Sequence, residues 1–336
     1  MFKTILIGFG KIGAGYAKDK LMSDSIKYST HVQVLKDHPC FDLKAVVDKD
    51  LLSLKEAKDL WFVDKAVQDI NLIENPEEFD VAVIAIPPKG RLEVIKKLPN
   101  LKAIILEKPV ASEIIEAREI SEYCKEKEIL VQVNFSKRFD KKILKHLKNF
   151  TKDIGKIQSA FGLYGNGLKN NGSHLIDWAR MFLGEVSWVQ SLGNGNFIEE
   201  GPINNDKNFP FAIGFESKVL LMVQPLKFDK YRENSLDFWG DNGRLFFPQE
   251  GLISLFYKKK NHRFSENDYE IENDIQISNL MGQSKSLYDL YTNLSETIFS
   301  RSKLNSSLNN AIITMKIIDN LEASFINKDE KIFLNV

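Results

Sequence analysis

Short apolar runs recur through the first 133 residues at the spacing of strands separated by helices. Apolar residues dominate most of these runs, which is typical of parallel strands that helices cover on both faces. The runs predict six strands, at 2–7, 41–47, 60–63, 81–86, 101–106 and 129–133. Helical patterns follow at 90–98 and 112–127, with Ser112 as a candidate N-cap. This part is predicted to be an α/β Rossmann-type domain with a doubly wound parallel sheet.

The rhythm of strand and helix is lost after residue 133, and strand patterns dominate. They predict strands at 156–164, 186–197, 209–215, 218–226, 236–247 and 251–257, and helices at 284–299 and 308–325. This order predicts a C-terminal α+β domain with an open, largely antiparallel sheet. A chain of 336 residues is too long for one ordinary core. We therefore expect two domains, 1–133 and 134–336.

One stretch of the second sheet is rich in apolar residues, at 209–215 and 219–223, and its second run is apolar on both strand faces. Helices of the same chain can pack against one face. The other face would then expose a larger apolar patch than a soluble monomer usually carries. Closed pairing would bury it, so we predict a homodimer or homotetramer. The alternative is that one chain covers both faces.

Composition excludes several classes of partner. Lys plus Arg and Asp plus Glu both number 46, so the net charge is zero and nothing favours nucleic acid or an anionic membrane. The two cysteines, Cys40 and Cys124, lack metal-ligand spacing. No apolar run approaches the length of a membrane span. We expect a cytoplasmic protein with reduced cysteines that has neither nucleic acid nor membrane as a partner.

A glycine motif of the form G-x-G-x-x-G follows the first strand directly, at 8–13. Its first glycine permits a tight turn, the second allows a pyrophosphate to approach, and the third lets helix and strand pack closely. We expect the following helix to begin at once and to present free N–H groups to the anion. A plain glycine turn is the weaker alternative. The predicted cofactor residues here are Gly8, Phe9, Gly10, Lys11 and Ile12.

Asp48 ends the second strand, where a carboxylate would accept hydrogen bonds from ribose hydroxyls and repel a 2′-phosphate. This favours NAD, although the neighbouring Lys49 leaves NADP possible. Asp48 lies 40 residues after Gly8, farther than usual. We interpret the polar stretch 18–30 as an insertion over the mouth of the cofactor site.

Two strand ends supply further candidates. Ile86 and Pro87 follow the fourth strand and are predicted to pass the nicotinamide ribose. The fifth strand ends in Glu107-Lys108-Pro109, which aims Lys108 at the edge where such sheets bind ligands. Taken alone, this segment is better explained as an ordinary solvent-facing lysine. The remaining motifs make the site interpretation the stronger one.

One helix interrupts the second sheet, near residues 170–180. His174 and Asp177 are three residues apart and share a helix face. A lone helical histidine is more often structural, and this pair is too small a ligand set to predict a metal site. The other histidines, His31, His38, His146 and His262, have no comparable setting in the sequence.

Together these motifs resemble the Gfo/Idh/MocA oxidoreductase family. The likeness rests on the glycine motif, on 107–109, on the segment 134–138 and on Gly172-x-His174-Leu175-Ile176-Asp177. It implies NAD(P)-dependent redox chemistry on sugars, polyols or sugar nucleotides. It also implies that Lys108 lies beside the nicotinamide with Glu107 and Asn134 at the cofactor site, and that His174 is catalytic.

Asn170 departs from the family pattern, because many members carry an Asp four residues before the catalytic His. An Asn can form hydrogen bonds but cannot offset an imidazolium charge. The predicted catalytic set is Lys108, His174, Asn170 and Asp177, with the proton transfer falling mainly on the first two. An imidazole ordinarily titrates near neutral pH, which suits a general base.

The leading hypothesis is an NAD-dependent dehydrogenase acting on a secondary alcohol of a sugar, polyol or sugar nucleotide. Two alternatives stay open. The protein could be a catalytically silent sensor of dinucleotide or sugar, or an NAD-dependent glycoside hydrolase. Substrate specificity is expected in loops such as 193–208, whose Gly- and Asn-rich composition allows many conformations.

Overall fold

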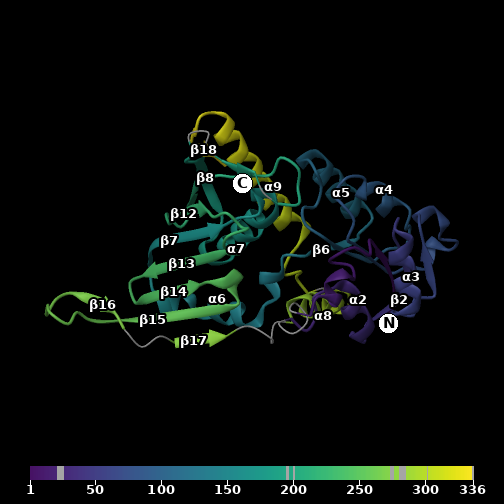
Figure 1. Ribbon diagram of the computed structural model, residues 1–336, viewed down its shortest axis with the longest axis horizontal. Helices are drawn as coiled ribbons and strands as arrows, with labels where there is room; N and C mark the ends of the chain where they lie inside the picture. The colour runs from purple at the N-terminus through teal and green to yellow at the C-terminus, as the bar shows by residue number, and fades with distance from the viewer. Residues whose placement is uncertain are drawn as a thin grey trace. The chain divides into compact units, whose positions relative to one another are not determined.

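The computed structural model describes residues 1–20, 26–193, 197–199, 201–272, 276–279, 285–300 and 302–334. The chain forms two compact units (Figure 1). The first comprises Met1–Lys141 and Gly282–Ile312, and the second comprises Lys142–Met281 and Ile313–Val336. This division differs from the predicted boundary at 133/134, chiefly because a late segment of the chain returns to the first unit. Within the described ranges, no helix has the length and apolar character that crossing a membrane requires.

The first unit is built on a six-stranded parallel sheet of order β3-β2-β1-β4-β5-β6. Its strands are β1 (Phe2–Ile7), β2 (Phe41–Val47), β3 (Lys65–Val67), β4 (Val81–Ile84), β5 (Ala103–Leu106) and β6 (Leu130–Val133). Its α-helices are α2 (His31–Asp37), α3 (Leu51–Asp59), α4 (Arg91–Lys96), α5 (Ile114–Glu126) and α8 (Ser286–Ser300). Short 3-10 turns lie at Gly15–Lys18, Ile70–Leu72, Pro76–Glu78 and Ser136–Phe139. The predicted doubly wound α/β class is confirmed.

Two local predictions in this unit are wrong. The run 60–63 is not a strand: Phe62 has a positive φ of 50° and is 79% exposed, and the edge strand β3 begins at Lys65. The N-cap of α5 is Glu113, and Ser112 lies one residue outside it. A short apolar run by itself does not distinguish a turn from an edge strand.

The helix expected directly after the glycine motif is interrupted. Only the 3-10 turn Gly15–Lys18 forms there, and α2 begins at His31. The backbone N–H groups of His31 and Val32 donate to the carbonyls of Ile12 and Gly13, both at 3.0 Å. In an uninterrupted helix those carbonyls would bond to residues 16 and 17. The structure therefore places a 15-residue insertion, 16–30, inside the first helical turn. Residues 21–25 of the predicted loop lie outside the described residues.

Helix α8 supplies part of the first unit's core, although it comes from the C-terminal part of the chain. Its buried residues Leu287, Leu290, Tyr291 and Leu294 recur at helical spacing and join the core around β1 and β2. The ring of Tyr291 contacts Phe41 edge-on, with centroids 5.1 Å apart. The returning helix thus carries a polar phenol into the interior.

The second unit is built on a ten-stranded sheet with the path β16-β15-β14-β13-β7-β12-β11-β8-β18, and β17 pairs with β15 (Figure 1). The pair β7–β12 is parallel, and the other described pairs are antiparallel. The strands are β7 (Ile157–Tyr164), β8 (Val186–Ser191), β11 (Phe211–Phe215), β12 (Leu220–Pro225), β13 (Ser235–Gly240), β14 (Gly243–Phe247), β15 (Ile253–Asn261), β16 (Tyr269–Ile271), β17 (Gln276–Asn279) and β18 (Ile332–Phe333). A separate two-stranded sheet pairs β9 (Ile198–Glu199) with β10 (Lys207–Asn208).

Helices cover one face of this sheet. They are α6 (Lys141–Ile154), which was not predicted, α7 (Ser173–Leu183) and α9 (Leu308–Ile326). Their apolar residues form one core with the inward side chains of the strands, among them Tyr164, Phe238 and Phe247. The predicted α+β sheet is confirmed. Residues 194–196 of one predicted strand and residue 284 of a predicted helix lie outside the described residues.

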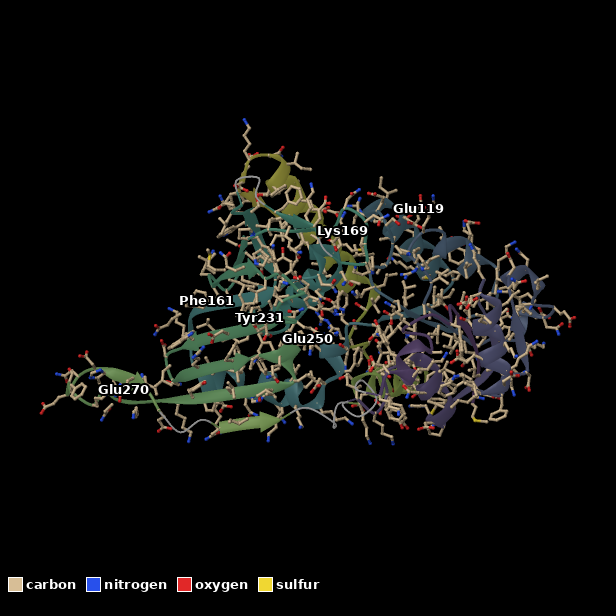
Figure 2. The ribbon with its side chains drawn as sticks, in the orientation of Figure 1. Glu119, Phe161, Lys169, Tyr231, Glu250 and Glu270 are labelled. Carbon is tan, nitrogen blue, oxygen red and sulfur yellow. The ribbon has the colours of Figure 1, made fainter. Side chains whose placement is uncertain are left out.

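The other face of the sheet carries a row of side chains across its centre that is apolar except for Asp237, which pairs with Arg244. Cross-strand pairing aligns Met222, Phe161, Asp237, Phe246 and Leu255 on neighbouring strands. Phe161, labelled in Figure 2, is 45% exposed. A sheet face of this kind is suited to pairing with a second copy of the chain.

Homo-oligomerisation through this face stays a prediction. We expect Phe161→Lys to lower the mass of the assembly at micromolar concentration, because a buried ammonium would face an apolar partner. Light scattering measures the mass, and Ile115→Lys on α5, at a site that is 67% exposed, is the control. A monomeric mass for the unmodified protein would contradict the prediction.

Candidate functional site

A pocket of about 440 Å³ opens at the carboxyl edge of the parallel sheet in the first unit. Strand β1 lies between β2 and β4 there, so the strand order reverses, which is where open α/β sheets bind ligands. The loops after the strands line it with Ile7, Gly8, Gly10, Val47, Asp48, Lys49, Gln68, Asp69, Ile70, Ala85, Ile86, Pro87, Lys89 and Val94.

Five predicted cofactor residues belong to this lining: Gly8, Gly10, Asp48, Ile86 and Pro87. The other predicted cofactor residues do not belong to it: Phe9, Lys11, Ile12, Glu107, Lys108 and Asn134. Several lining residues escaped prediction, namely Gln68, Asp69, Ile70, Lys89 and Val94. Their local sequence carries no phosphate or ribose motif, and only the sheet topology brings them to the edge.

The three glycines of the motif serve two distinct purposes. Gly8 has a φ of +97°, and a Cβ there would approach the backbone of Ala85 to 2.7 Å. A Cβ on Gly13 would collide with the carbonyl of Gly8. A Cβ on Gly10 would meet nothing within 4 Å, although Gly10 lines the pocket. The first and third glycines are therefore required by packing, whereas the second keeps the pocket open.

Asp48 is held by backbone donors beside this turn. Its Oδ2 accepts from the N–H of Phe9 at 2.5 Å, and its Oδ1 accepts from the N–H of Asp50 at 2.9 Å. Each oxygen of an ionised carboxylate can accept a further hydrogen bond. Asp48 is therefore oriented at the pocket wall with acceptor capacity left for ribose hydroxyls.

Arg91 ties the pocket wall to the loop that carries Lys108. Its guanidinium donates to the carbonyl of Ile86 at 2.6 Å, and on the other side to the carbonyls of Glu107, Pro109 and Val110, the last two at 2.6 and 3.1 Å. Arg91 is 2% exposed. Desolvation by burial lowers its pKa to about 10, against the charges of Glu107 and Glu116, and Arg91 stays protonated at neutral pH.

Glu107 contacts two side chains that hold it in place. Its Oε1 accepts from Asn134 Nδ2 at 2.6 Å and lies 2.9 Å from His31 Nε2. Burial by itself raises the pKa of the Glu107 carboxyl. The His31 and Asn134 hydrogen bonds and the Lys108 charge outweigh burial, so this pKa lies below its ordinary value. His31, which has no setting like that of His174 in the sequence, thus gains its acidic partner through the fold, from a residue 76 positions away.

The side chain of Asn134 has a buried amide oxygen, Oδ1. The residue is 8% exposed, and its Oδ1 finds no hydrogen-bond partner among the residues that the structure describes. A buried acceptor left unpaired costs about 1–3 kcal/mol. The amide orientation follows from its bond to the Glu107 carboxylate, which requires Nδ2 as donor. Such an atom at a strand end suits a ligand that presents an N–H group.

His174, Asn170 and Asp177 lie in the second unit. A π-helical segment, Gly167–Gly172, leads directly into α7, so His174 sits in the first turn of a helix and is partly exposed. π-Helical turns occur frequently at functional sites. Lys108 belongs to the first unit, and the predicted pairing of Lys108 with His174 therefore stays a prediction.

The surroundings of Asn170 explain why it is not an Asp. Its Nδ2 donates to the carbonyl of Asn166 at 3.1 Å, and its backbone N–H donates to Asp206 Oδ2 at 3.0 Å. An Asp at position 170 would set its own oxygen against that carbonyl and add a second carboxylate beside Asp206. Asp206 is 1% exposed, and burial raises its pKa. The turn is therefore built for a neutral donor at 170.

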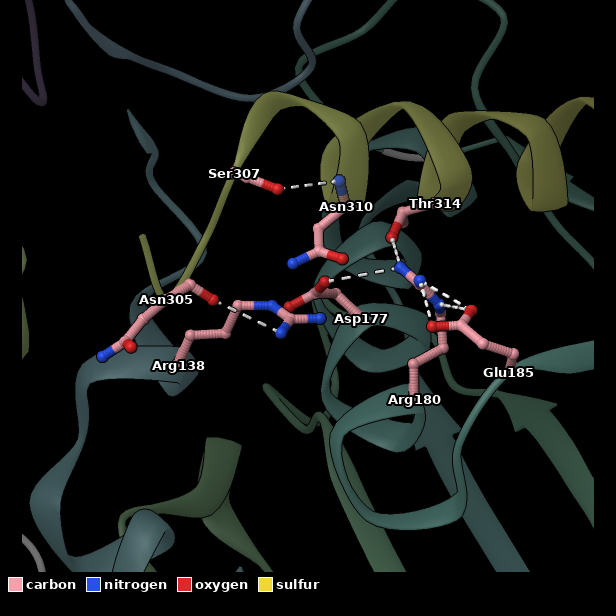
Figure 3. A network of polar contacts seen from close by, with 8 residues as sticks. All are labelled: Arg138, Asp177, Arg180, Glu185, Asn305, Ser307, Asn310 and Thr314. Atoms are coloured by element: carbon pink, nitrogen blue, oxygen red, sulfur yellow. Dashed lines mark hydrogen bonds and ion pairs between the residues drawn. The ribbon is translucent and has the colours of Figure 1, made fainter. Parts of the chain in front are cut away.

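Asp177 and Tyr164 have structural partners. Asp177 is 1% exposed and lies 3.9 Å from Arg180, which also binds Glu185 and Thr314 (Figure 3). Tyr164 Oη bonds to the backbone of Phe209 at 2.9 Å, and burial raises its pKa. These contacts favour a supporting role for Asp177 and a structural role for Tyr164.

A model of an oxidoreductase family with an NAD-binding Rossmann fold matches residues 2–135. The model is that of the Gfo/Idh/MocA family, and the match covers the Rossmann-type part of the chain. The chain is also 25% identical over 226 residues to YrbE of Bacillus subtilis strain 168, described as an uncharacterized oxidoreductase. That match covers 60% of this chain and 61% of YrbE, so the chain spans less than two thirds of the curated relative.

Solved structures match nearly the whole chain. An oxidoreductase from Agrobacterium radiobacter, in complex with NAD+, L-tartaric acid and magnesium, gives a TM-score of 0.75 at 16% identity, covering 99% of this chain and 98% of that one. An NAD binding oxidoreductase from Klebsiella pneumoniae gives 0.77 at 16% identity, covering 100% and 99%. The transcriptional regulator Gal80p from Kluyveromyces lactis gives 0.78 at 14% identity, covering 99% and 91%. At these identities the likeness shows the fold.

The segment that matches the NAD-binding family model has a pocket that fits NAD. Gly10 leaves the room that a pyrophosphate needs, and Asp48 offers oriented acceptors for ribose hydroxyls. Lys49 and Lys89 line the same pocket and add positive charge near an anionic ligand. The cofactor predicted from the sequence is confirmed.

The glycine pair Gly10 and Gly13 separates cofactor binding from folding. Gly10→Ala should weaken NAD binding about tenfold or more with little change in thermal stability, because the added methyl enters the open pocket. Gly13→Ala should instead destabilise the domain by about 1–3 kcal/mol, the usual scale of overpacking. Fluorescence titration with NAD and a thermal melt measure the two effects. Equal losses of stability in both variants would contradict this division.

Proposed function

We propose that the protein is an NAD-dependent dehydrogenase that oxidises a secondary alcohol of a sugar, polyol or sugar nucleotide. The observation that carries the proposal is the link made by Arg91. One buried guanidinium binds both Ile86 in the pocket wall and the carbonyls that flank Lys108. This link between the pocket wall and the Lys108 loop supports a role for Lys108 in chemistry on a group bound beside the cofactor.

The chain's own residues would handle the proton and the developing charge. Bound NAD supplies the hydride acceptor. The Lys108 ammonium would donate a hydrogen bond to the reacting oxygen and stabilise its negative charge. His174 would take the hydroxyl proton as general base. Asn134 Oδ1 would accept from an amide N–H, such as that of the cofactor's carboxamide.

A silent binding protein is the second candidate, and Asn170 favours it. The neutral side chain of Asn170 offers no carboxylate from that position to stabilise a charged His174. A sensor needs the pocket and does not need that stabilisation.

A substrate panel tests the proposal. Pure protein is incubated with NAD and a set of sugars, polyols and sugar nucleotides. Net formation of NADH supports the dehydrogenase. Cleavage without net NADH would indicate a glycoside hydrolase, and saturable binding without reaction would indicate a sensor.

Asp48 should set the cofactor preference. Replacing Asp48 with Ser removes the charge that repels a 2′-phosphate, while Lys49 and Lys89 remain. We expect the ratio of NAD to NADP affinity to fall about tenfold or more, as measured by titration with each dinucleotide. Equal affinity of the unmodified protein for NAD and NADP would show that Asp48 does not select the cofactor.

Lys108→Ala and His174→Ala should each lower turnover by about 10²-fold or more, the scale of a lost acid/base group. NAD affinity should change much less. Lys102→Ala and His262→Ala are the controls, because Lys102 pairs with Asp80 at the other end of β5 and His262 lies on the β15–β16 hairpin. Near-normal turnover in His174→Ala would remove it from the mechanism.

Asn170→Asp is the companion variant. It should destabilise the second unit by about 1–3 kcal/mol, because the donor to the Asn166 carbonyl is lost and a charge is added beside Asp206. A thermal melt measures the change. Higher turnover with unchanged stability would instead show that the departure from the family pattern lowers activity.

A further inference from the structure

A buried chain of polar contacts ends at Glu107, the residue before Lys108. Tyr291 Oη lies 2.8 Å from His31 Nδ1, and His31 Nε2 lies 2.9 Å from Glu107 Oε1. His31 is 0% exposed. The three residues come from α8, from the start of α2 and from the end of β5, and all belong to the first unit. Glu107 is bonded through the backbone to Lys108.

The protonation pattern of this chain follows from its members. Burial raises the pKa of Tyr291 well above its ordinary value, so the phenol keeps its proton and can donate it to His31 Nδ1. A neutral imidazole that accepts at Nδ1 carries its proton on Nε2 and donates it to the Glu107 carboxylate. Every polar atom of the imidazole is then satisfied, which a buried ring requires.

We propose that His31 is a positioning residue of the oxidoreductase site: it fixes the Glu107 carboxylate and thereby sets the position and charge environment of the Lys108 ammonium. The proposal rests on the dehydrogenase function proposed above. His31 does not touch the reacting groups and acts through Glu107.

The charge of Glu107 depends on this contact. The groups that face it are His31 from α2, Tyr291 from α8, Asn134 after β6, the adjacent Lys108 and Arg91 from α4. Burial raises the pKa of Glu107, and the hydrogen bond from His31 is the largest of the influences that lower it. Loss of that bond should raise the pKa. Glu107 would then take up a proton at a higher pH and lose the negative charge beside Lys108.

Two near-isosteric variants divide the contacts of His31. In His31→Gln the amide nitrogen can occupy the place of Nε2 and still donate to Glu107. In His31→Asn the shorter amide can occupy the place of Nδ1 and still accept from Tyr291, but it does not reach Glu107. His38→Asn is the matched control, because His38 is also buried between α2 and α8, bonds to Thr292 at 3.1 Å and does not contact Glu107.

Turnover, its pH profile and NAD affinity are measured with a substrate found in the panel. His31→Asn should lower turnover by about 10- to 100-fold, the scale typical of a residue that orients a functional group. The acidic limb of its pH profile of turnover should move to higher pH. Its NAD affinity should stay within about threefold of that of the unmodified protein. His31→Gln should recover most of the turnover and the original limb. An unchanged profile in His31→Asn, an equal loss in His31→Gln, or an equal loss in His38→Asn would overturn the proposal.

An infrared titration of the Glu107 carboxyl, assigned by the band that Glu107→Gln removes, separates this proposal from the dehydrogenase function. It needs no substrate. A higher titration point in His31→Asn and an unshifted one in His31→Gln would support the control of Glu107 by His31, even if no substrate in the panel were oxidised. An unshifted titration in His31→Asn would overturn it even if the protein proved to be a dehydrogenase.

Discussion

The Arg91 guanidinium is the interaction on which the first unit's site depends. Burying an unpaired charge costs several kcal/mol, and Arg91 forms no ion pair among the described residues. Its compensation comes from backbone carbonyls at the ends of two neighbouring strands. Those carbonyls have no partner in the sheet at that point, so the side chain and the strand ends satisfy each other. The loops after β4 and β5 are thereby held together.

This link explains how the loop that carries Lys108 can be held in a fixed position. Loop side chains usually move more than those on strands. The carbonyls on both sides of Lys108 are bound by Arg91, and the side chain of Glu107 is bound by Asn134 and His31. The segment therefore has supports on its backbone and on its side chain. The first comes from a residue 16 positions earlier in the chain, and the second from residues 76 positions earlier and 27 positions later.

Local pattern predicted the fold and the part of the site that lies within single motifs. The bounds of β1 and β2 agree with the predicted ranges, because each is an apolar run closed by a glycine or an aspartate. His31 and Arg91 were missed because their partners are separated from them in sequence and meet only through the sheet. Asn170 was noticed as a departure, but its reason, a buried Asp206 held under the same turn, lies 36 residues away. Contacts over 36 or 76 residues have no signature within a short window of sequence.

The insertion at 16–30 shows what the spacing of a motif measures. Asp48 follows Gly13 by 35 residues in the sequence, which weakens the fingerprint when the spacing is taken literally. His31 and Val32 resume the hydrogen bonds of the interrupted turn, so the 15 inserted residues do not count toward the spacing of the motif. The remaining separation is about 20 residues, as in an ordinary dinucleotide-binding unit. The resumed helix also places His31 where its imidazole reaches Glu107. The insertion therefore lengthens the spacing of the cofactor motif and at the same time positions a residue that contacts the loop of Lys108.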